Sequence, residues 1–295
     1  MAAILAARDT GPDDRNDSAD DVQIRRSRQA CDPRMKLPWK RRSEDAAVPA
    51  LLPGFGPPGP EAPTYVVGDI HGRSDLLDRM LGLIDDDIHD RGVAETARVV
   101  IVGDFIDRGP DTRQVIDTLV DLTRLMPRRV TPLLGNHERM MLDFLDRPEG
   151  RARSWLRHGG LDTLFSYGVG GVGATPSPER ATEAANRLAE ALTPEVHSWL
   201  ARLPMQDRSG NLGIVHAGAD PDSPFDLQSP ANLTWGHPAF LEKPRRDGLW
   251  IAYGHTVVEE AHARDGRIAV DTGAWESGRL TAAAIWQGEV RFLQT

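Results

Sequence analysis

Apolar runs alternate with amphipathic segments along the chain from Thr64 onward. Three short apolar runs have the length of buried strands: TYVV (64–67), RVVIV (98–102) and VTPLL (130–134). Three segments repeat apolar residues at helical spacing: 74–88, 111–126 and 138–145. This alternation predicts parallel strands with right-handed crossovers, and sheets of that kind bind ligands at the carboxyl ends of their strands.

The pattern changes in the second half of the chain. Residues 150 to about 203 are typical of interrupted helices and predict a helical insert. Beyond Leu203, five short apolar runs follow with Gly or Asp-Gly turns: LGIVHAG, LWIAYGH, RIAVDTG, LTAAAIW and VRFLQ. Turns of this kind favour a second sheet that is more antiparallel than the first.

Residues 1–63 have the composition of a disordered tail and linker, so we expect one folded domain over 64–295. The tail clusters charged residues and ends in VPALLPGFGPPGPEAP, which suits neither helix nor sheet. Its ten Lys and Arg balance ten Asp and Glu, so the net charge of −9 belongs to residues 64–295. An acidic body argues against a nucleic-acid-binding surface. The basic segment 34–42 leaves lipid or nucleic-acid binding open as a lesser alternative, and Met35 is an alternative start.

Cysteine content and hydropathy indicate the cellular compartment in which the protein is expected. Cys31 is the single cysteine, so no intrachain disulfide can form. The first residues lack the basic start and long apolar region of a signal peptide, and no run approaches 18 apolar residues. We therefore expect a cytoplasmic protein without a membrane partner.

Chemically active residues follow one predicted strand after another. The segments are GDIHG (68–72), GDFIDRG (103–109), GNHE (135–138), VHAG (215–218) and YGHT (253–256). Charge at the end of a buried strand is costly unless it is paired or bound to metal. A lone histidine such as His216 or His255 is more often a core residue, and GNHE alone is usually a turn. Five such segments in one order make these separate explanations improbable.

Carboxylate, amide and imidazole groups together suit divalent ions of intermediate hardness. Two ions about 3.5–4 Å apart need a shared ligand, and a carboxylate is the natural bridge. Asp104 follows the middle predicted strand, so we expect it to be that bridge.

These five segments, in this order, resemble those of the metallophosphoesterases, in particular the phosphoprotein phosphatase branch that includes bacteriophage lambda phosphatase. The resemblance covers Thr64 to Gln294, and residues 155–168 are similar to a stretch in bacterial members. It implies an α/β fold, the calcineurin-like β-sandwich flanked by helices, with a metal site at the carboxyl ends of the strands.

The resemblance also implies a role for each residue. The cofactor would be two divalent metal ions, Mn with Fe or Zn as alternatives. The first ion would be held by Asp69, His71 and Asp104, and the second by Asp104, Asn136, His216 and His255. A metal-bridging hydroxide would attack phosphorus directly. Arg108 would hold the phosphate, His137 would protonate the leaving group, and Asp107 would orient His137.

One segment departs from the family pattern. Related bacterial enzymes often carry a second phosphate-binding arginine in a W-x-R motif, where this chain has Trp235-Gly236-His237. His237 could bind the substrate in its place, Arg245 or Arg246 could reach in, or the second contact could be missing.

The expected reaction is hydrolysis of phosphoserine and phosphothreonine in a phosphorylated protein or phosphopeptide. A diadenosine tetraphosphate or other nucleotide hydrolase of the same fold is the first alternative. Its symmetric bacterial forms resemble G-D-x-Q-G and G-N-H-D, whereas this chain has His71 and Glu138 at those places. A phosphoprotein-binding pseudophosphatase is the second alternative, and it would require lost ligands.

Overall fold

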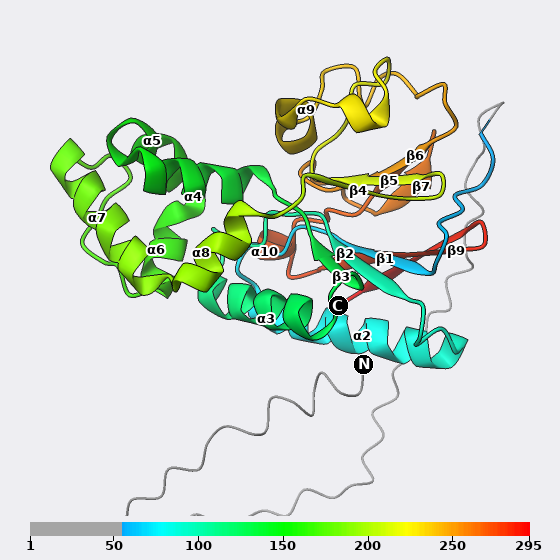
Figure 1. Cartoon of the computed structure of the whole chain (residues 1–295), viewed down its shortest axis with the longest axis horizontal. Helices are drawn as coiled ribbons and strands as arrows, with labels where there is room; N and C mark the ends of the chain where they lie inside the picture. The colour runs from blue at the N-terminus through cyan, green and yellow to red at the C-terminus, as the bar shows by residue number, and fades with distance from the viewer. Residues whose placement is uncertain (1–54) are drawn as a thin grey trace, which may run out of the picture. The chain divides into compact units, whose positions relative to one another are not determined.

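Two sheets of five strands each lie at the centre of the computed structural model, which describes residues 55–295 (Figure 1). The strands of the first sheet, in spatial order, are β10 (Glu289–Gln294), β9 (Thr281–Trp286), β1 (Thr64–Val67), β2 (Arg98–Ile101) and β3 (Val130–Pro132). β1, β2 and β3 run parallel, as the strand-helix alternation predicts. β9 and β10 add antiparallel pairs on the other side of β1.

The second sheet contains, in spatial order, β4 (Gln206–Ser209), β5 (Leu212–Val215), β6 (Trp250–Tyr253), β8 (Arg267–Ala269) and β7 (His262–Arg264). The prediction of a more antiparallel sheet is wrong here, since the three central strands β5, β6 and β8 run parallel. A long connection that contains α9 (Pro230–Trp235) separates β5 from β6 and permits a parallel crossover. The last two predicted strands, β9 and β10, pair with the first sheet instead.

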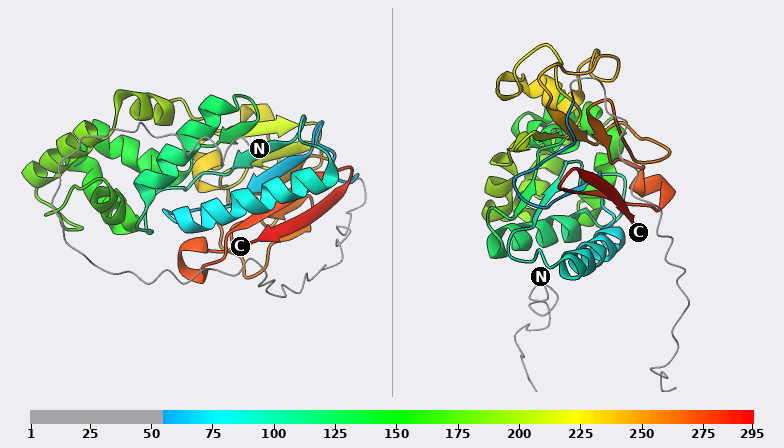
Figure 2. Two further views of the ribbon diagram at one scale, coloured as in Figure 1. Left: turned by 90° about the horizontal axis from the view of Figure 1, so that it is seen from below. Right: turned by 90° about the vertical axis from the view of Figure 1, so that its right-hand side faces the viewer.

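Helices flank the sheets on the outside. The three predicted helices are present as α2 (Ser74–Arg91), α3 (Thr112–Leu125) and α4 (Asn136–Asp146). The segment predicted as a helical insert contains α5 (Pro148–Trp155), α6 (Leu161–Ser166), α7 (Pro178–Ala191) and α8 (Pro194–Ala201), with a π-helical turn over Leu156–Gly160. α2 and α3 lie side by side against the first sheet, whereas α4 to α8 gather beyond the ends of its strands (Figures 1 and 2). A short helix, α10 (Ala274–Ser277), and a 3-10 turn (Phe225–Leu227) complete the described elements.

The inner faces of the two sheets enclose one apolar core. Val66 and Val100 from the first sheet pack with Ile214, Ala252 and Ile268 from the second, and all five are fully buried. This sandwich of two sheets flanked by helices agrees with the fold class that the sequence predicts. In the described part of the chain, no helix has the length and apolarity needed to cross a membrane.

Residues 55–63 lie against the second sheet, although the sequence assigns them to the linker. The Phe55 ring meets the Trp250 ring edge-on at 6.1 Å, and Phe55 belongs to the core between the sheets. The Trp250 indole donates a hydrogen bond to the carbonyl of Gly56 at 2.9 Å, and Asn211 donates one to the carbonyl of Pro57 at 3.1 Å. We therefore propose that the folded domain begins at or before Phe55. The expectations for residues 1–54 lie outside the described residues.

Candidate metal centre

The carboxyl ends of the parallel strands bring the predicted ligands together. Asp69 and His71 follow β1, Asp104 follows β2, His216 follows β5 and His255 follows β6. Two groups of side chains have ligand atoms within 4.8 Å of one another: His71, Asp104 and His137, and Asp104, His216 and His255. Asp104 is common to both groups. This is the shared position that the sequence predicts.

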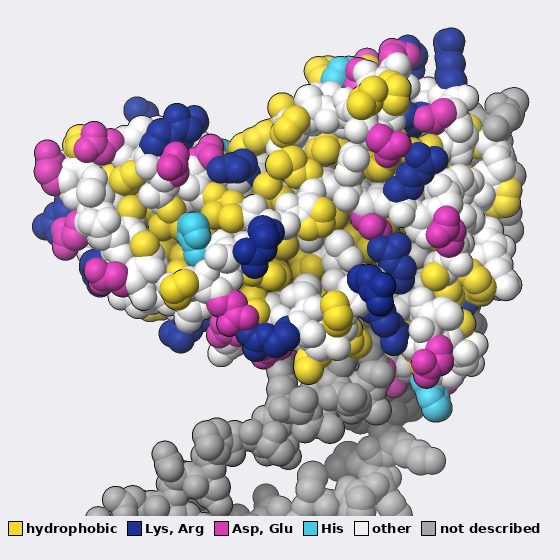
Figure 3. Space-filling view, in the orientation of Figure 1, with side chains coloured by type: hydrophobic (Ala, Val, Ile, Leu, Met, Phe, Trp, Pro, Cys, Tyr) yellow, Lys and Arg dark blue, Asp and Glu magenta, His cyan; other side chains and the backbone are white. Residues whose placement is uncertain are grey.

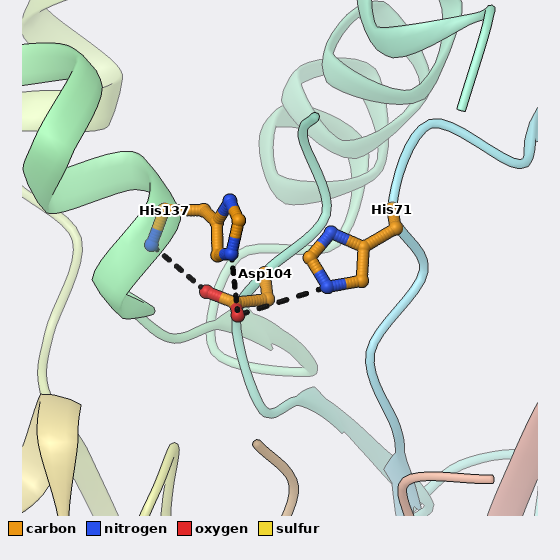
Figure 4. Close-up of side chains that lie close together, drawn as sticks. All are labelled: His71, Asp104 and His137. Carbon is orange, nitrogen blue, oxygen red and sulfur yellow. Dashed lines mark hydrogen bonds and ion pairs between the residues drawn. The ribbon is translucent and has the colours of Figure 1, made fainter. Parts of the chain in front are cut away.

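The carboxylate of Asp104 lies between histidines from different elements (Figure 4). Its Oδ2 lies 3.8 Å from Nε2 of His71 and 3.8 Å from Nε2 of His137. Its Oδ1 lies 3.3 Å from Nε2 of His216 and accepts a hydrogen bond from the backbone N–H of His137 at 3.0 Å. Asp104 is only 2% exposed, so water does not solvate this charge.

Backbone carbonyls set the orientation of two of these histidines. The Nδ1 of His71 lies 2.7 Å from the carbonyl oxygen of Ile106, and the Nδ1 of His216 lies 3.1 Å from that of Val102. A carbonyl can only accept, so Nδ1 carries the proton in each ring. In the neutral ring Nε2 then presents a lone pair to the Asp104 carboxylate. Lone pairs that face one another in this way fit a cation between them.

The remaining predicted ligands border the same centre. The Oδ1 of Asn136, the first residue of α4, lies 2.8 Å from Nε2 of His216. The carboxylate of Asp69 accepts the backbone N–H of His255 at 3.1 and 3.2 Å from its two oxygens. The His255 ring meets the His216 ring edge-on at 5.1 Å. All six residues that the sequence proposes as ligands therefore lie in one region.

The backbone of the site is strained. Eight non-glycine residues in the described part of the chain have positive φ, and five of them belong to the site: His71, Asp104, Asp107, Arg108 and His255. Each such conformation costs on the order of 1–3 kcal/mol and persists only when the surroundings impose it. Strain concentrated in this way is typical of a functional site.

Glycines let the backbone approach the carboxylates closely. A Cβ on Gly135 would lie 2.2 Å from Oδ1 of Asp104, and a Cβ on Gly254 would lie 2.0 Å from Oδ1 of Asp69. No other amino acid fits at these two positions without displacing a proposed ligand.

Two acidic residues at this centre were not assigned a role from the sequence. The carboxylate of Glu138 accepts the backbone N–H groups of Asp104, Phe105 and Gly135 at 2.9 to 3.0 Å, and it thereby fixes the loop after β2 to the start of α4. Asp271 follows β8 and is 3% exposed. Its position after an apolar run in RIAVDTG was the available signal, because proposed ligands such as Asp104 and His216 also follow apolar runs.

The electrostatics of these buried groups also fit bound cations. Burial, together with the charge of Asp104, raises the pKa of Glu138 to about 7. Burial raises the pKa of Asp271 to about 6, and burial and the nearby Asp271 and Asp104 raise that of Asp69 well above its ordinary value. Burial opposes ionisation of Asp104, but His216, His137 and His71 hold its pKa well below the ordinary value. A set of buried carboxyl groups that repel one another is stabilised by positive charge.

The candidate proton donor lies beside this centre. Nδ1 of His137 is 2.6 Å from Oδ2 of Asp107, a carboxylate that is fully buried. Burial opposes protonation of His137, but the charge of Asp104 and the hydrogen bond and charge of Asp107 raise its pKa. The guanidinium of Arg108 reaches within 3.4 Å of Nε2 of His137 and lies 5.2 Å from the centre of the Trp275 ring.

His237 and Arg245, two candidates for the second phosphate contact, make other contacts. Neither group of candidate metal ligands within residues 55–295 includes His237, whose Nδ1 accepts the backbone N–H of Ala239 at 3.3 Å. Arg245 is buried and donates to the carbonyls of Asp220 and Ser223 at 2.9 and 3.0 Å. Those bonds occupy the guanidinium of Arg245, so it is not free to hold phosphate.

The raised pKa values predict how pH affects the metal-free protein. The pKa values of Glu138, His137 and His216 lie above their ordinary values, so the folded chain holds protons that the unfolded chain releases. Glu138 loses its stabilising effect as pH rises through about 7, and the two histidines lose theirs in the range above about pH 6.5. Burial lowers the pKa of His71 to about 3 and that of His255 to about 4, so these two affect stability below this range.

Metal ions bind the same groups in competition with protons, so their affinity increases with pH. We therefore expect the urea midpoint to fall with pH in chelator and to rise or stay level in Mn²⁺ over about pH 6.5 to 8. The same downward slope in both solutions would contradict metal binding at these residues.

Comparison with known proteins agrees with this geometry. The chain is 28% identical over 244 residues to the asymmetrical bis(5'-nucleosyl)-tetraphosphatase PrpE of Anoxybacillus flavithermus, covering 74% of this chain and 88% of that one. It is 30% identical over 228 residues to serine/threonine-protein phosphatase 1 of Salmonella typhimurium, covering 75% and 91%. A crystal structure provisionally described as a diadenosine tetraphosphatase has the same fold, with a TM-score of 0.55 and 21% identity over 80% of this chain and 95% of that one.

These two relatives thus carry the names of two kinds of enzyme, a nucleoside tetraphosphatase and a protein phosphatase. The sequence profile of the calcineurin-like phosphoesterases matches residues 62–259, which include all the proposed metal ligands, the Asp107–His137 pair and Arg108. The chain belongs to the calcineurin-like phosphoesterase family.

Proposed function

We propose that this chain hydrolyses phosphoserine and phosphothreonine in proteins as a metal-dependent phosphomonoesterase. Its metal ligands would be Asp69, His71, Asp104, Asn136, His216 and His255. Two divalent ions bound there would neutralise phosphate charge and lower the pKa of a coordinated water. Mn²⁺ is the ion that we propose, with Fe and Zn as alternatives, because the ligand set mixes carboxylate, amide and imidazole groups.

The observation that carries this proposal is the short contact between His137 and Asp107. Because the carboxylate can only accept, Nδ1 of His137 carries a proton, and the opposite nitrogen, Nε2, lies 3.8 Å from Asp104 on the side of the proposed metals. A proton held on Nε2 would be given to the leaving group. Serine and threonine leave as strongly basic alkoxides, so their release needs such a donor.

Arg108 would bind the phosphate and would also affect the protonation of His137. In the structure it lies within hydrogen-bond distance of Nε2 of His137, where it disfavours a second proton on that ring. A phosphate oxygen is a better acceptor for the guanidinium. Arrival of the substrate would therefore draw Arg108 onto the phosphate and allow His137 to hold its proton on Nε2.

A change of His137 to alanine tests the acid role. We expect His137→Ala to lower kcat/KM for a phosphoserine peptide by about 10²–10⁴-fold, and to affect p-nitrophenyl phosphate much less because an aryl leaving group scarcely needs a proton. Initial rates with both substrates in Mn²⁺ measure this.

Arg108→Ala is the matched control for this comparison. Arg108 would contact the phosphate that both substrates share, so its loss should slow the two by similar factors. If His137→Ala also slows both substrates equally, His137 does not act as the acid.

A pocket beside the centre favours a second candidate, hydrolysis of dinucleoside polyphosphates. Its volume is about 130 Å³ and it is lined by Arg139, Met140, Asp143, Arg151, Ser154 and Trp235. The Trp235 ring is 48% exposed and lies 6.3 Å from the His255 ring. On the face drawn in Figure 3, basic and acidic side chains are interspersed around hydrophobic ones. An exposed indole suits stacking on a nucleobase, whereas both arginines of the pocket pair with Asp143.

Substrate ranking separates the two candidates. On the main proposal, kcat/KM for phosphoserine peptides exceeds that for diadenosine tetraphosphate by about tenfold or more, because the site would supply the proton that otherwise limits release of a serine alkoxide. The reverse ranking, with loss of diadenosine tetraphosphate hydrolysis in Trp235→Ala, would favour the second candidate.

A further inference from the structure

Asp107 is held by residues of the helical insert as well as by His137. Its Oδ2 accepts the indole N–H of Trp155 at 2.9 Å, and its Oδ1 accepts the hydroxyl of Thr163 at 2.6 Å. Trp155 ends α5 and Thr163 lies in α6, 48 and 56 positions from Asp107 in the sequence. Asp107, Trp155 and Thr163 are all fully buried.

The donors and acceptors around Thr163 fix the direction of each hydrogen bond between Thr163, Asp107 and Thr112. The single hydroxyl hydrogen of Thr163 points to Oδ1 of Asp107, because a carboxylate supplies none. The hydroxyl oxygen of Thr163 also accepts the backbone N–H of Asp107 at 3.0 Å. The hydroxyl of Thr112, 3.1 Å away, must then donate to Thr163. Thr163 thus fixes both the backbone and the carboxylate of Asp107.

The turn between Trp155 and Thr163 also packs against Arg108, the residue that follows Asp107. The backbone N–H of Arg108 donates to the carbonyl of Gly159 at 3.3 Å. A Cβ on Gly159 would lie 2.8 Å from Cγ of Arg108, and one on Gly160 would lie 2.6 Å from the Trp155 ring. Gly159 therefore allows the insert to lie directly on the loop that carries Asp107 and Arg108, and Gly160 leaves room for the Trp155 ring.

We infer that the insert completes the proton-donating pair, with Trp155 and Thr163 as positioning residues that hold the Asp107 carboxylate toward His137. Asp107 and Arg108 have φ of 69° and 68°, a conformation that the surroundings must impose. The contacts from the insert supply that restraint. Proton transfer depends on this alignment, because an acid contributes only when it lies within hydrogen-bond reach of the leaving oxygen. The inference rests on the proposed acid role of His137.

Thr163→Val tests it in the full chain with Mn²⁺, since valine keeps the shape and removes the hydroxyl. We expect kcat/KM for a phosphoserine peptide to fall about tenfold more than kcat/KM for p-nitrophenyl phosphate, the loss of one hydrogen bond to a charged group. Thr163→Ser keeps the hydroxyl, so it should restore the ratio of kcat/KM for the phosphoserine peptide to kcat/KM for p-nitrophenyl phosphate. Trp155→Phe, which removes the indole donor, should change the ratio in the same direction.

Thr112→Val is the matched control, because the Thr112 hydroxyl bonds the backbone N–H of Asp107 and the Thr163 hydroxyl, and does not contact the carboxylate. It should change the ratio less than Thr163→Val. The inference is overturned if Thr163→Val slows both substrates equally, if serine fails to restore the ratio, or if Thr112→Val has as large an effect. Should His137→Ala itself show no dependence on leaving group, the acid role fails instead. Thermal melting of each variant shows whether it is folded.

If Thr163→Val does not fold, Trp155→Phe tests the positioning role of the insert instead. An unchanged ratio between the two substrates in a folded Trp155→Phe protein would then overturn the inference.

Discussion

The proposed metal centre depends on the carboxylate of Asp104, which lies among side chains from several strands and a helix. Asp104 stands at the end of β2, the strand between β1 and β3, and faces histidines that follow β1 and β5 as well as one in the first turn of α4. A buried negative charge must be balanced, and here the proposed cations would provide the balance. The strained backbone at Asp104 and the bare Gly135 beside it both serve to place this one group.

The sheet topology makes that convergence possible. β1 and β2 run parallel in one sheet, and β5, β6 and β8 run parallel in the other. Residues that immediately follow these strands meet at one edge of the sandwich, although more than 180 positions separate Asp69 from His255. The apolar core between the sheets holds the strands in place, and the strands in turn position the proposed ligands.

The grouping of the proposed ligands could be predicted because they lie beside strands that the apolar pattern predicts. Asp104, His216 and His255 are examples, and the family resemblance gave their order a meaning. Trp155 and Thr163 could not be linked to Asp107 in this way, since no periodicity encodes a contact between a loop and a helix some fifty residues away. The packing of Phe55 against Trp250 could not be predicted for a related reason. The Pro/Gly-rich surroundings of Phe55 exclude helix and strand, but an extended segment can still pack through one ring and a few carbonyls.

The central claim is that Asp104 joins two metal ions in one centre. Electron paramagnetic resonance of the full chain reconstituted with Mn²⁺, together with its metal content, tests this most directly. Two ions per chain with an exchange-coupled spectrum are expected, because both groups of candidate ligands contain Asp104. The spectrum of an isolated Mn²⁺ ion at saturating metal, with one ion bound per chain, would contradict the claim.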